Sequence, residues 1–381
     1  MNAAMLPTDP RALFEIPDDL AYFNCASVGP LPRAAREAIE AGAARRAQPW
    51  RVTMKHWIDD YEERRSLFAA LAGAPADAIA LIPSVSYGAA VAARNLDAAP
   101  GQQVLLIAED FPSDVYTWRA FAAEKGCSIL TVSRSPGGTW TDAVLARLDE
   151  SIAVVAVPNV QWTDGALLDL VRIGARAREI GAALVVDASQ SFGIMPLDLD
   201  AVRPDFLIAV GYKWLLGPYG LAYLYADPKY WDGVPIEHNW LSRAGSEDFS
   251  SLVDYRDEYR PGARRFDMGE RSALEMNDGA VASLRLLNDW GVAGIAERLA
   301  ATTARIETEA KALGLAISSA PARGPHLLGI ELPRETAVQA FSTLRERGVY
   351  VAFRGNAIRI AAHVYNNEAD VDRLVDALAA L

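Results

Sequence analysis

Residues 206–220 read FLIAVGYKWLLGPYG, with a single lysine, Lys213, between an apolar run and a turn rich in glycine and proline. The apolar run predicts a buried strand. A lysine at the end of such a strand loses hydration, which lowers its pKa and favours the neutral, nucleophilic amine. That amine can form a Schiff base with an aldehyde. The alternative is a strand-end lysine that extends its ammonium group to water.

Six similar apolar runs surround this one, and Ala- and Arg-rich amphipathic segments separate most of them. Continuous apolar strands that alternate with helices are typical of a largely parallel sheet covered on both faces. We therefore predict an α/β fold with a mostly parallel, seven-stranded sheet. The six further predicted strands lie within residues 78–85, 102–110, 128–133, 152–160, 182–189 and 220–226.

The rest of the chain suggests a second, smaller unit. Residues 228–272 are polar and lack the strand–helix rhythm, so this excursion is either functional or mobile. A helical stretch over 277–313 leads into a pattern of strand, helix, strand, strand and helix. We predict an N-terminal segment over 1–30 that packs with the small domain, a large domain over 31–272, and a small α+β domain over 273–381.

Composition excludes several classes of function. The chain has 381 residues and a formal net charge of −12, which argues against nucleic acid or an anionic membrane as a partner. Its two cysteines, Cys25 and Cys127, and its four scattered histidines do not have the spacing of a metal site. We see neither a signal peptide nor a membrane-spanning apolar run, and expect a cytoplasmic protein.

Polar residues at the ends of predicted strands are candidates for the site, because ligands bind there in open parallel sheets. Asp187 ends one strand, and Gln190 follows three residues later. In enzymes that use pyridoxal phosphate (PLP), an Asp pairs with the pyridinium nitrogen of the cofactor, and Gln190 is placed to bond its phenolic oxygen. The alternative is that Asp187 only caps a turn.

Two other strand ends carry further candidates. Ser84, Val85 and Ser86 begin a predicted helix, whose free N–H groups would bind a phosphate; the alternative is a simple N-cap. Phe111 is placed to stack on a flat ring and Asp114 to orient a neighbouring group. The alternative is a core aromatic residue before a helix that starts with proline.

Arg359 lies within the apolar strand AIRIAA, residues 357–362. A buried guanidinium needs a partner, and a substrate carboxylate matches its planar fork. A buried ion pair with an internal Asp or Glu is an equal alternative.

Taken together, these motifs resemble PLP enzymes of the aspartate-aminotransferase fold, in the class V aminotransferase group. That group includes cysteine desulfurases, kynureninase and isopenicillin N epimerase-like proteins. The resemblance runs from YFNCASVGPLP at residues 22–32 to the C-terminal stretch at residues 359–378. It implies PLP as cofactor, an amino-acid substrate, Schiff-base and quinonoid chemistry, and a homodimer with shared sites.

The resemblance also implies individual roles. Lys213 resembles the Schiff-base lysine, and Arg359 the residue that holds the substrate α-carboxylate, with Asn24 and Asp114 near the substrate. The end of the excursion is similar to a loop that reaches the neighbouring subunit's phosphate through Arg271, for which Arg264 and Arg265 are equal candidates. The implied cofactor-binding set is Ser84, Val85, Ser86, Phe111, Asp187, Gln190, Tyr212, Lys213 and Arg271.

Departures from the group's pattern reduce the number of candidate reactions. Desulfurases have a nucleophilic Cys shortly before the carboxylate Arg, whereas residues 348–359 contain none. Gln190 stands where kynureninase has His. We therefore predict an aminotransferase, with a C–S or C–C lyase or an epimerase as the alternative. A non-catalytic phosphate- or nucleotide-binding module is a further alternative, although the glycine-rich fingerprints of such modules are missing.

Overall fold

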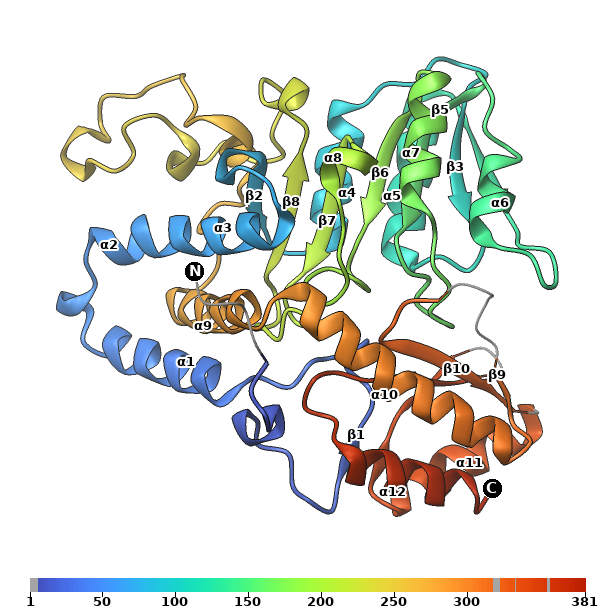
Figure 1. The fold of residues 1–381 in the computed structure, drawn as a ribbon. Coiled ribbons are helices and arrows are strands. Elements are labelled where there is room, and N and C mark those ends of the chain that lie inside the picture. Colours follow the sequence, from blue (N-terminus) through green and yellow to red (C-terminus); the bar gives the residue numbers. More distant parts are fainter. Residues whose placement is uncertain (1–5, 318–322, 333, 355–356) are drawn as a thin grey trace.

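The computed structural model describes residues 6–317, 323–332, 334–354 and 357–381. A large sheet with helices on both sides forms the upper part of the molecule, and a small sheet with its own helices lies below it (Figure 1). Across the described residues, no helix is long and apolar enough to cross a membrane.

The large sheet confirms the seven predicted strands. Its strand order is β2-β8-β7-β6-β5-β3-β4, and only β8 runs antiparallel to its neighbours β7 and β2. Each strand is a short, largely apolar run, and all but β4 are buried along most of their length. The strands are β2 (Ile79–Ile82), β3 (Gln103–Ile107), β4 (Ser128–Val132), β5 (Ile152–Pro158), β6 (Ala183–Asp187), β7 (Phe206–Val210) and β8 (Ala222–Ala226).

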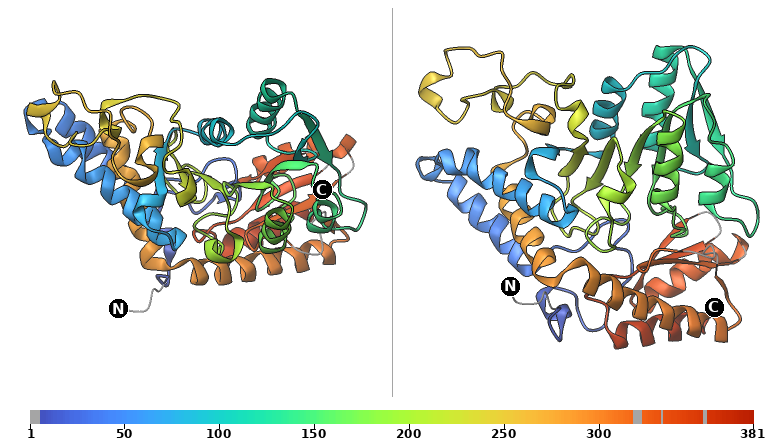
Figure 2. Two further views of the ribbon diagram at one scale, coloured as in Figure 1. Left: turned by 90° about the horizontal axis from the view of Figure 1, so that it is seen from above. Right: turned by 45° about the horizontal axis from the view of Figure 1, so that its top comes forward.

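Helices cover both faces of this sheet (Figure 2). Successive strand residues point to opposite faces, so Val104 and Leu106 enter one core cluster with α4 and α5, while Leu105 and Ile107 enter the other with α3 and α7. The helices of this part are α1 (Arg33–Arg46), α2 (Met54–Trp57), α3 (Asp59–Ala72), α4 (Val85–Asn95), α5 (Pro112–Lys125), α6 (Trp140–Leu145), α7 (Leu170–Glu179) and α8 (Leu199–Val202).

The C-terminal part is an α+β unit, as its pattern predicted. Its sheet has the order β12-β13-β10-β9, and β1 (Ala21–Tyr22) pairs in parallel with β11 (Val349–Tyr350). This pairing agrees with an N-terminal segment that packs on the small domain, while the domain boundaries stay a prediction. The other elements are β9 (Ala316–Ile317), β10 (Leu327–Glu331), α11 (Arg334–Glu346), β12 (Ala352–Arg354), β13 (Ala357–Ala361) and α12 (Glu368–Leu378).

The helical stretch between the two parts is broken, which the sequence pattern did not predict. It forms α9 (Leu274–Trp290) and α10 (Val292–Ala312). Gly291 separates them with φ of 73°, a left-handed value that other L-residues adopt only with strain. The glycine therefore sets the angle at which the chain passes to the small sheet.

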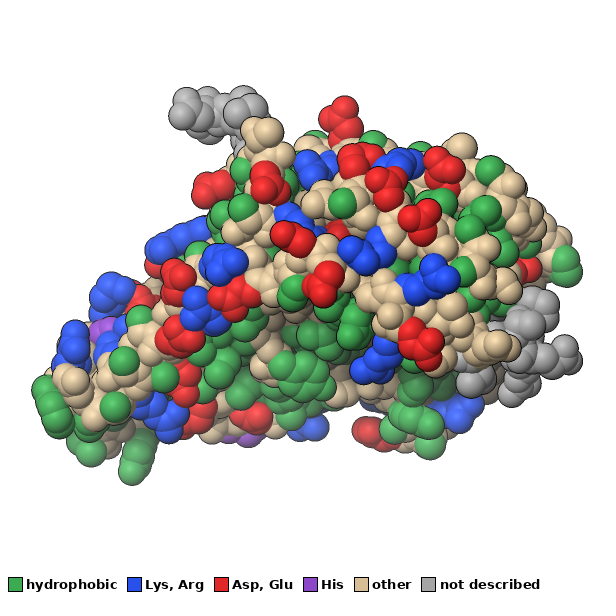
Figure 3. Space-filling view, turned by 90° about the horizontal axis from the view of Figure 1, so that it is seen from below, with side chains coloured by type: hydrophobic (Ala, Val, Ile, Leu, Met, Phe, Trp, Pro, Cys, Tyr) green, Lys and Arg blue, Asp and Glu red, His purple; other side chains and the backbone are tan. Residues whose placement is uncertain are grey.

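The excursion over residues 228–272 contains four short 3₁₀ turns and one isolated bridge between Arg243 and Tyr259. The turns are η4 (Pro228–Tyr230), η5 (Trp240–Ser242), η6 (Phe249–Ser251) and η7 (Gly262–Phe266). In Figure 1 it lies on the same side of the molecule as α1 and α2. On the lower face, acidic and basic side chains are interspersed, and hydrophobic side chains gather between them (Figure 3).

Candidate active site

Lys213 lies just beyond the end of β7, and its side chain is buried, with 8% exposed. Its Nζ lies 5.5 Å from the centre of the Phe111 ring and 5.8 Å from that of Tyr212. Burial lowers the pKa of Lys213 to about 8, with Asp187 opposing and Arg359 adding to the shift. The amine therefore loses its proton far more readily than an exposed lysine. It lines one cavity with Asp110, Phe111, Pro158, Val160, Trp162, Asp187 and Gln190.

Three carboxylates gather at this end of the sheet. Asp187 ends β6 and lines the cavity, while its Oδ1 accepts a hydrogen bond of 2.8 Å from the Ser189 N–H, so it also caps a turn. Asp114 is buried in the first turn of α5; burial and then the charges of Asp187 and Asp110 raise its pKa well above the usual range. Burial, with Asp187 adding to it, raises the pKa of Asp110 to about 7. Simultaneous ionisation of all three carboxyl groups is thus disfavoured.

The Asp114 side chain is more deeply buried than contact with a substrate would require. Together with Asp110 and Asp187 it lines a small cavity whose other walls are Trp118, Ala156, Val157, Val185 and Ile208. Its expected place near the substrate stays a prediction, whereas its position beside Asp187 favours support of that carboxylate.

The predicted phosphate site has the expected backbone. Ser84 is the N-cap of α4, where its Oγ accepts from the Tyr87 N–H at 3.2 Å and lies 3.0 Å from the Oγ of Ser86. The simple N-cap alternative is therefore realised, and the helix start still presents N–H groups. The Tyr212 ring lies 4.5 Å from that of Tyr219, and burial raises its pKa.

Close packing fixes the turn that carries Lys213. The Gly29 N–H donates to the Tyr212 carbonyl at 2.8 Å, and a Cβ at position 29 would lie 2.1 Å from the Lys213 carbonyl oxygen. The glycine of the N-terminal GPLP turn is thus required by the approach of these two backbones.

Arg359 is 1% exposed, yet no carboxylate lies within ion-pair distance of it in the described ranges. Its Nη1 donates to the Trp162 carbonyl at 2.8 Å, and its Nη2 donates to Ser27 Oγ at 2.6 Å and to Asn24 Oδ1 at 3.4 Å. Its buried Nε has no hydrogen-bond partner there. Burial, followed by repulsion from Arg354, lowers its pKa to about 9. Of the two alternatives, the internal ion pair is not found among the residues that the structure describes.

The arginines at the end of the excursion lie in a buried network. Arg271 donates to the Leu241 carbonyl at 2.8 Å and lies 3.1 Å from Asp267. Arg264 pairs with Glu62, and Arg265 lies 3.2 Å from Asp232. All three therefore have acceptors within the chain, and the phosphate contact of a neighbouring subunit stays a prediction.

Several residues of the site went unnoticed in the sequence. Trp162 and Ser27 bind Arg359, Asp110 completes the carboxylate group, and Trp214 holds Gln190. Of these four residues, only Asp110 could have been found from the sequence, because it lies at the end of a predicted strand and next to Phe111. The others come together only through the tertiary fold.

These residues fit PLP. A buried amine of lowered pKa suits a Schiff base, a carboxylate at a strand end suits the pyridinium nitrogen, and a helix N-terminus suits the phosphate. The unpartnered Nε of Arg359 suits a ligand carboxylate.

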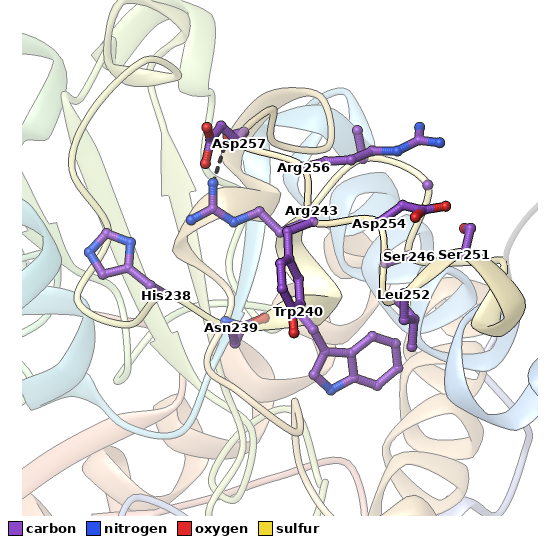
Figure 4. A pocket seen from close by; sticks show the side chains of 13 residues that line it. His238, Asn239, Trp240, Arg243, Ser246, Ser251, Leu252, Asp254, Arg256 and Asp257 are labelled. Atoms are coloured by element: carbon purple, nitrogen blue, oxygen red, sulfur yellow. Dashed lines mark hydrogen bonds between the residues drawn. The ribbon is translucent and has the colours of Figure 1, made fainter.

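A separate and more open pocket of about 330 Å³ lies within the excursion (Figure 4). It shares no residue with the Lys213 cavity, and Arg243 bridges its wall by donating to the Asp257 carbonyl at 2.6 Å. It carries none of the predicted site residues.

Fold and site together define a PLP-type α/β enzyme, and comparisons with known proteins identify its family. The aminotransferase class-V family model matches residues 37–374, so the chain belongs to this family and is a PLP-dependent enzyme. It is 31% identical to the uncharacterized aminotransferase YcbU of Bacillus subtilis, over 86% of this chain and 85% of that protein. It is 28% identical to a kynureninase of Deinococcus radiodurans, over 97% and 92% of the two chains.

The fold is also similar to that of solved PLP enzymes. A lysine-to-alanine variant of the lyase C-DES, with glycine covalently linked to its PLP, superposes with a TM-score of 0.85 at 22% identity. The match covers 98% of this chain and 99% of the other. The predicted fold class is thus confirmed.

Proposed function

We propose that this enzyme transfers the amino group of an amino acid, and that Lys213 is both the residue that binds PLP and the base that removes the Cα proton. The observation that carries the proposal is the buried Lys213 amine, with its lowered pKa, among Phe111, Asp187 and Gln190. When bound, PLP supplies an electron sink that stabilises negative charge at Cα.

The remaining residues bind and orient. Asp187 would meet the ring nitrogen, Gln190 the phenolic oxygen and Phe111 the ring face. The start of α4 at Ser84, Val85 and Ser86, with Tyr212, would hold the phosphate. Arg359, supported by Asn24, would take the α-carboxylate and so determine which Cα bond faces the Lys213 amine.

A PLP-dependent lyase or epimerase is the second candidate. The likeness to YcbU supports an aminotransferase, whereas the likeness to kynureninase and to C-DES supports a C–C or C–S lyase. The absence of cysteine from residues 348–359 argues against desulfurase chemistry. Family membership removes the alternative of a non-catalytic binding module.

One experiment separates these reactions. The purified holoenzyme is mixed with a panel of amino acids, with and without an oxo-acid acceptor, and the products are identified by mass spectrometry. An aminotransferase turns over, and forms the matching oxo acid and a new amino acid in more than stoichiometric amounts, only when the acceptor is present. Formation of sulfide, alanine or an inverted substrate without acceptor would instead establish a lyase or an epimerase.

We also infer a homodimer. Trp50, Val253 and Tyr255 are 78%, 76% and 95% exposed in the single chain. They lie on the α1–α2 connection and on the excursion, which protrude on the same side of the molecule (Figure 1). Large hydrophobic side chains exposed on protruding segments are typical of surfaces that a partner covers.

A further inference from the structure

Gln190 has only one possible amide orientation. The indole N–H of Trp214 donates to Gln190 Oε1 at 2.9 Å, and Gln190 Nε2 donates to the Ala26 carbonyl at 3.2 Å. An indole nitrogen only donates and a carbonyl only accepts, so these two partners distinguish the amide oxygen from the amide nitrogen. Within the described part of the chain, the second N–H of Nε2 has no other acceptor, and Gln190 lines the Lys213 cavity.

Trp214 is itself held from the small-domain side. It is 1% exposed, its ring packs edge-on to His326 at 4.5 Å, and it stacks on His363 at 6.0 Å. His363 Nδ1 accepts from the Val364 N–H at 2.8 Å, so its Nε2 carries the proton and donates to the Trp214 carbonyl at 3.2 Å. The tryptophan is thus fixed through both its ring and its backbone.

His326 acts on Gln190 in the same manner. Its Nε2 lies 2.5 Å from the backbone carbonyl oxygen of Gln190, which only accepts, so this nitrogen also carries the proton. Burial lowers the pKa of His326 to about 3 and that of His363 to about 4, so both rings are neutral near pH 7. The two histidines precede β10 and follow β13 of the small sheet, which lies below the lower ends of β6 and β7 (Figure 1).

We propose that Trp214 is a positioning residue that acts through Gln190, keeping an amide N–H directed at the cofactor's phenolic oxygen, and that His326 and His363 hold this pair. The inference rests on the proposed contact between Gln190 and the cofactor. An N–H donor favours the ionised phenolic oxygen. Without the indole N–H the amide can rotate and present its carbonyl oxygen instead, which disfavours that charge.

The test is a pH titration of the visible absorption band of the holoenzyme. Trp214→Phe keeps an aromatic ring and removes the donor, so we expect the titration midpoint to rise by about one pH unit, the size of one lost hydrogen bond. Gln190→Ala should raise the midpoint in the same direction. The double variant should show the Gln190→Ala midpoint and no more, because the tryptophan acts only through the amide.

A matched control is Trp140→Phe. Trp140 is also a buried tryptophan of the large domain, but its indole N–H has no partner in the described residues. It should leave the midpoint unchanged. Should Trp214→Phe fail to fold, benzothienylalanine incorporated at position 214 replaces the ring N–H by sulfur at nearly constant size, and the same rise is expected.

The outcomes distinguish failure of the positioning role of Trp214 from failure of the proposed contact between Gln190 and the cofactor. A midpoint that moves in Gln190→Ala but not in the position-214 variants, or that moves additively in the double variant, overturns the positioning role and leaves the proposed function intact. A midpoint unmoved by Gln190→Ala shows that the amide does not meet the cofactor, which overturns the Gln190 contact and the inference together.

Discussion

Lys213 places an amine where burial opposes its charge. The folded-state pKa of about 8 lies below the value of about 10.4 for a lysine in the unfolded chain. The unfolded state therefore binds this proton more tightly, and the charge destabilises the fold below pH 8 by about 3 kcal/mol. The destabilisation fades as pH rises from 8 to about 10.4, where the amine is neutral in both states.

Lys213→Met should therefore stabilise the cofactor-free protein near pH 7, and the gain in unfolding free energy should shrink between pH 8 and about 10.4. Urea unfolding across this range measures it. Lys311→Met makes the same change at a side chain that is 59% exposed, and serves as the surface control. A gain in unfolding free energy that stays constant with pH would mean that burial does not lower the pKa of Lys213.

Arg359 should separate substrate binding from cofactor binding. Arg359→Ala should raise KM for an amino acid about ten-fold or more through loss of the bidentate pair, while the cofactor's absorption band stays. Arg359→Lys keeps the charge but not the fork, so KM should still rise. Loss of PLP with an unchanged KM would make Arg359 structural. Arg354, whose guanidinium lies 5.4 Å from the centre of the Trp162 ring, would then be the next candidate.

The sequence predicted the residues whose position along the chain carries the signal. Lys213, Asp187 and Gln190 lie at or just after the ends of apolar strands, and the structure brings them to one cavity. Trp214 and His326 look like ordinary core residues in the sequence, because their polar atoms acquire meaning only from partners distant along the chain. The residues alone also left the partner of Arg359 open, since the sequence does not show whether a carboxylate lies nearby; its predicted role came from the family resemblance.

At the scale of elements, short apolar runs predicted the large sheet, because strands buried on both faces need apolar side chains throughout. The two-residue strand β9 lacks such a run and was missed. The break between α9 and α10 was also missed, since a single glycine within a helical pattern is compatible with an unbroken helix.

Gly291→Ala should destabilise the protein by about 1–2 kcal/mol, because alanine must adopt the left-handed φ of 73° there. Gly294 is the matched control: it lies within α10, and a Cβ there would meet nothing within 4 Å. Gly294→Ala should stabilise by about 0.5–1 kcal/mol through helix propensity. Thermal unfolding of both variants measures the difference, and equal effects of the same sign would contradict the assigned role of Gly291.

At the scale of the whole molecule, the homodimer predicts a sedimenting species of twice 41.2 kDa. Trp50→Glu combined with Tyr255→Glu should shift it toward monomer, since each change puts a charge into the inferred interface. Tyr116→Glu, at a site 65% exposed on α5, should leave the mass unchanged. A wild-type monomer with full affinity for PLP would refute a phosphate site shared between subunits.

The central claim is that Lys213 binds the cofactor at the junction of the large and the small sheet. Borohydride reduction of the holoenzyme, followed by proteolysis and mass spectrometry, tests it most directly because reduction fixes a Schiff base permanently to its lysine. The account predicts a pyridoxyl group on the peptide that contains Lys213, and none in Lys213→Arg. A pyridoxyl group on any other lysine of the wild-type enzyme would contradict it.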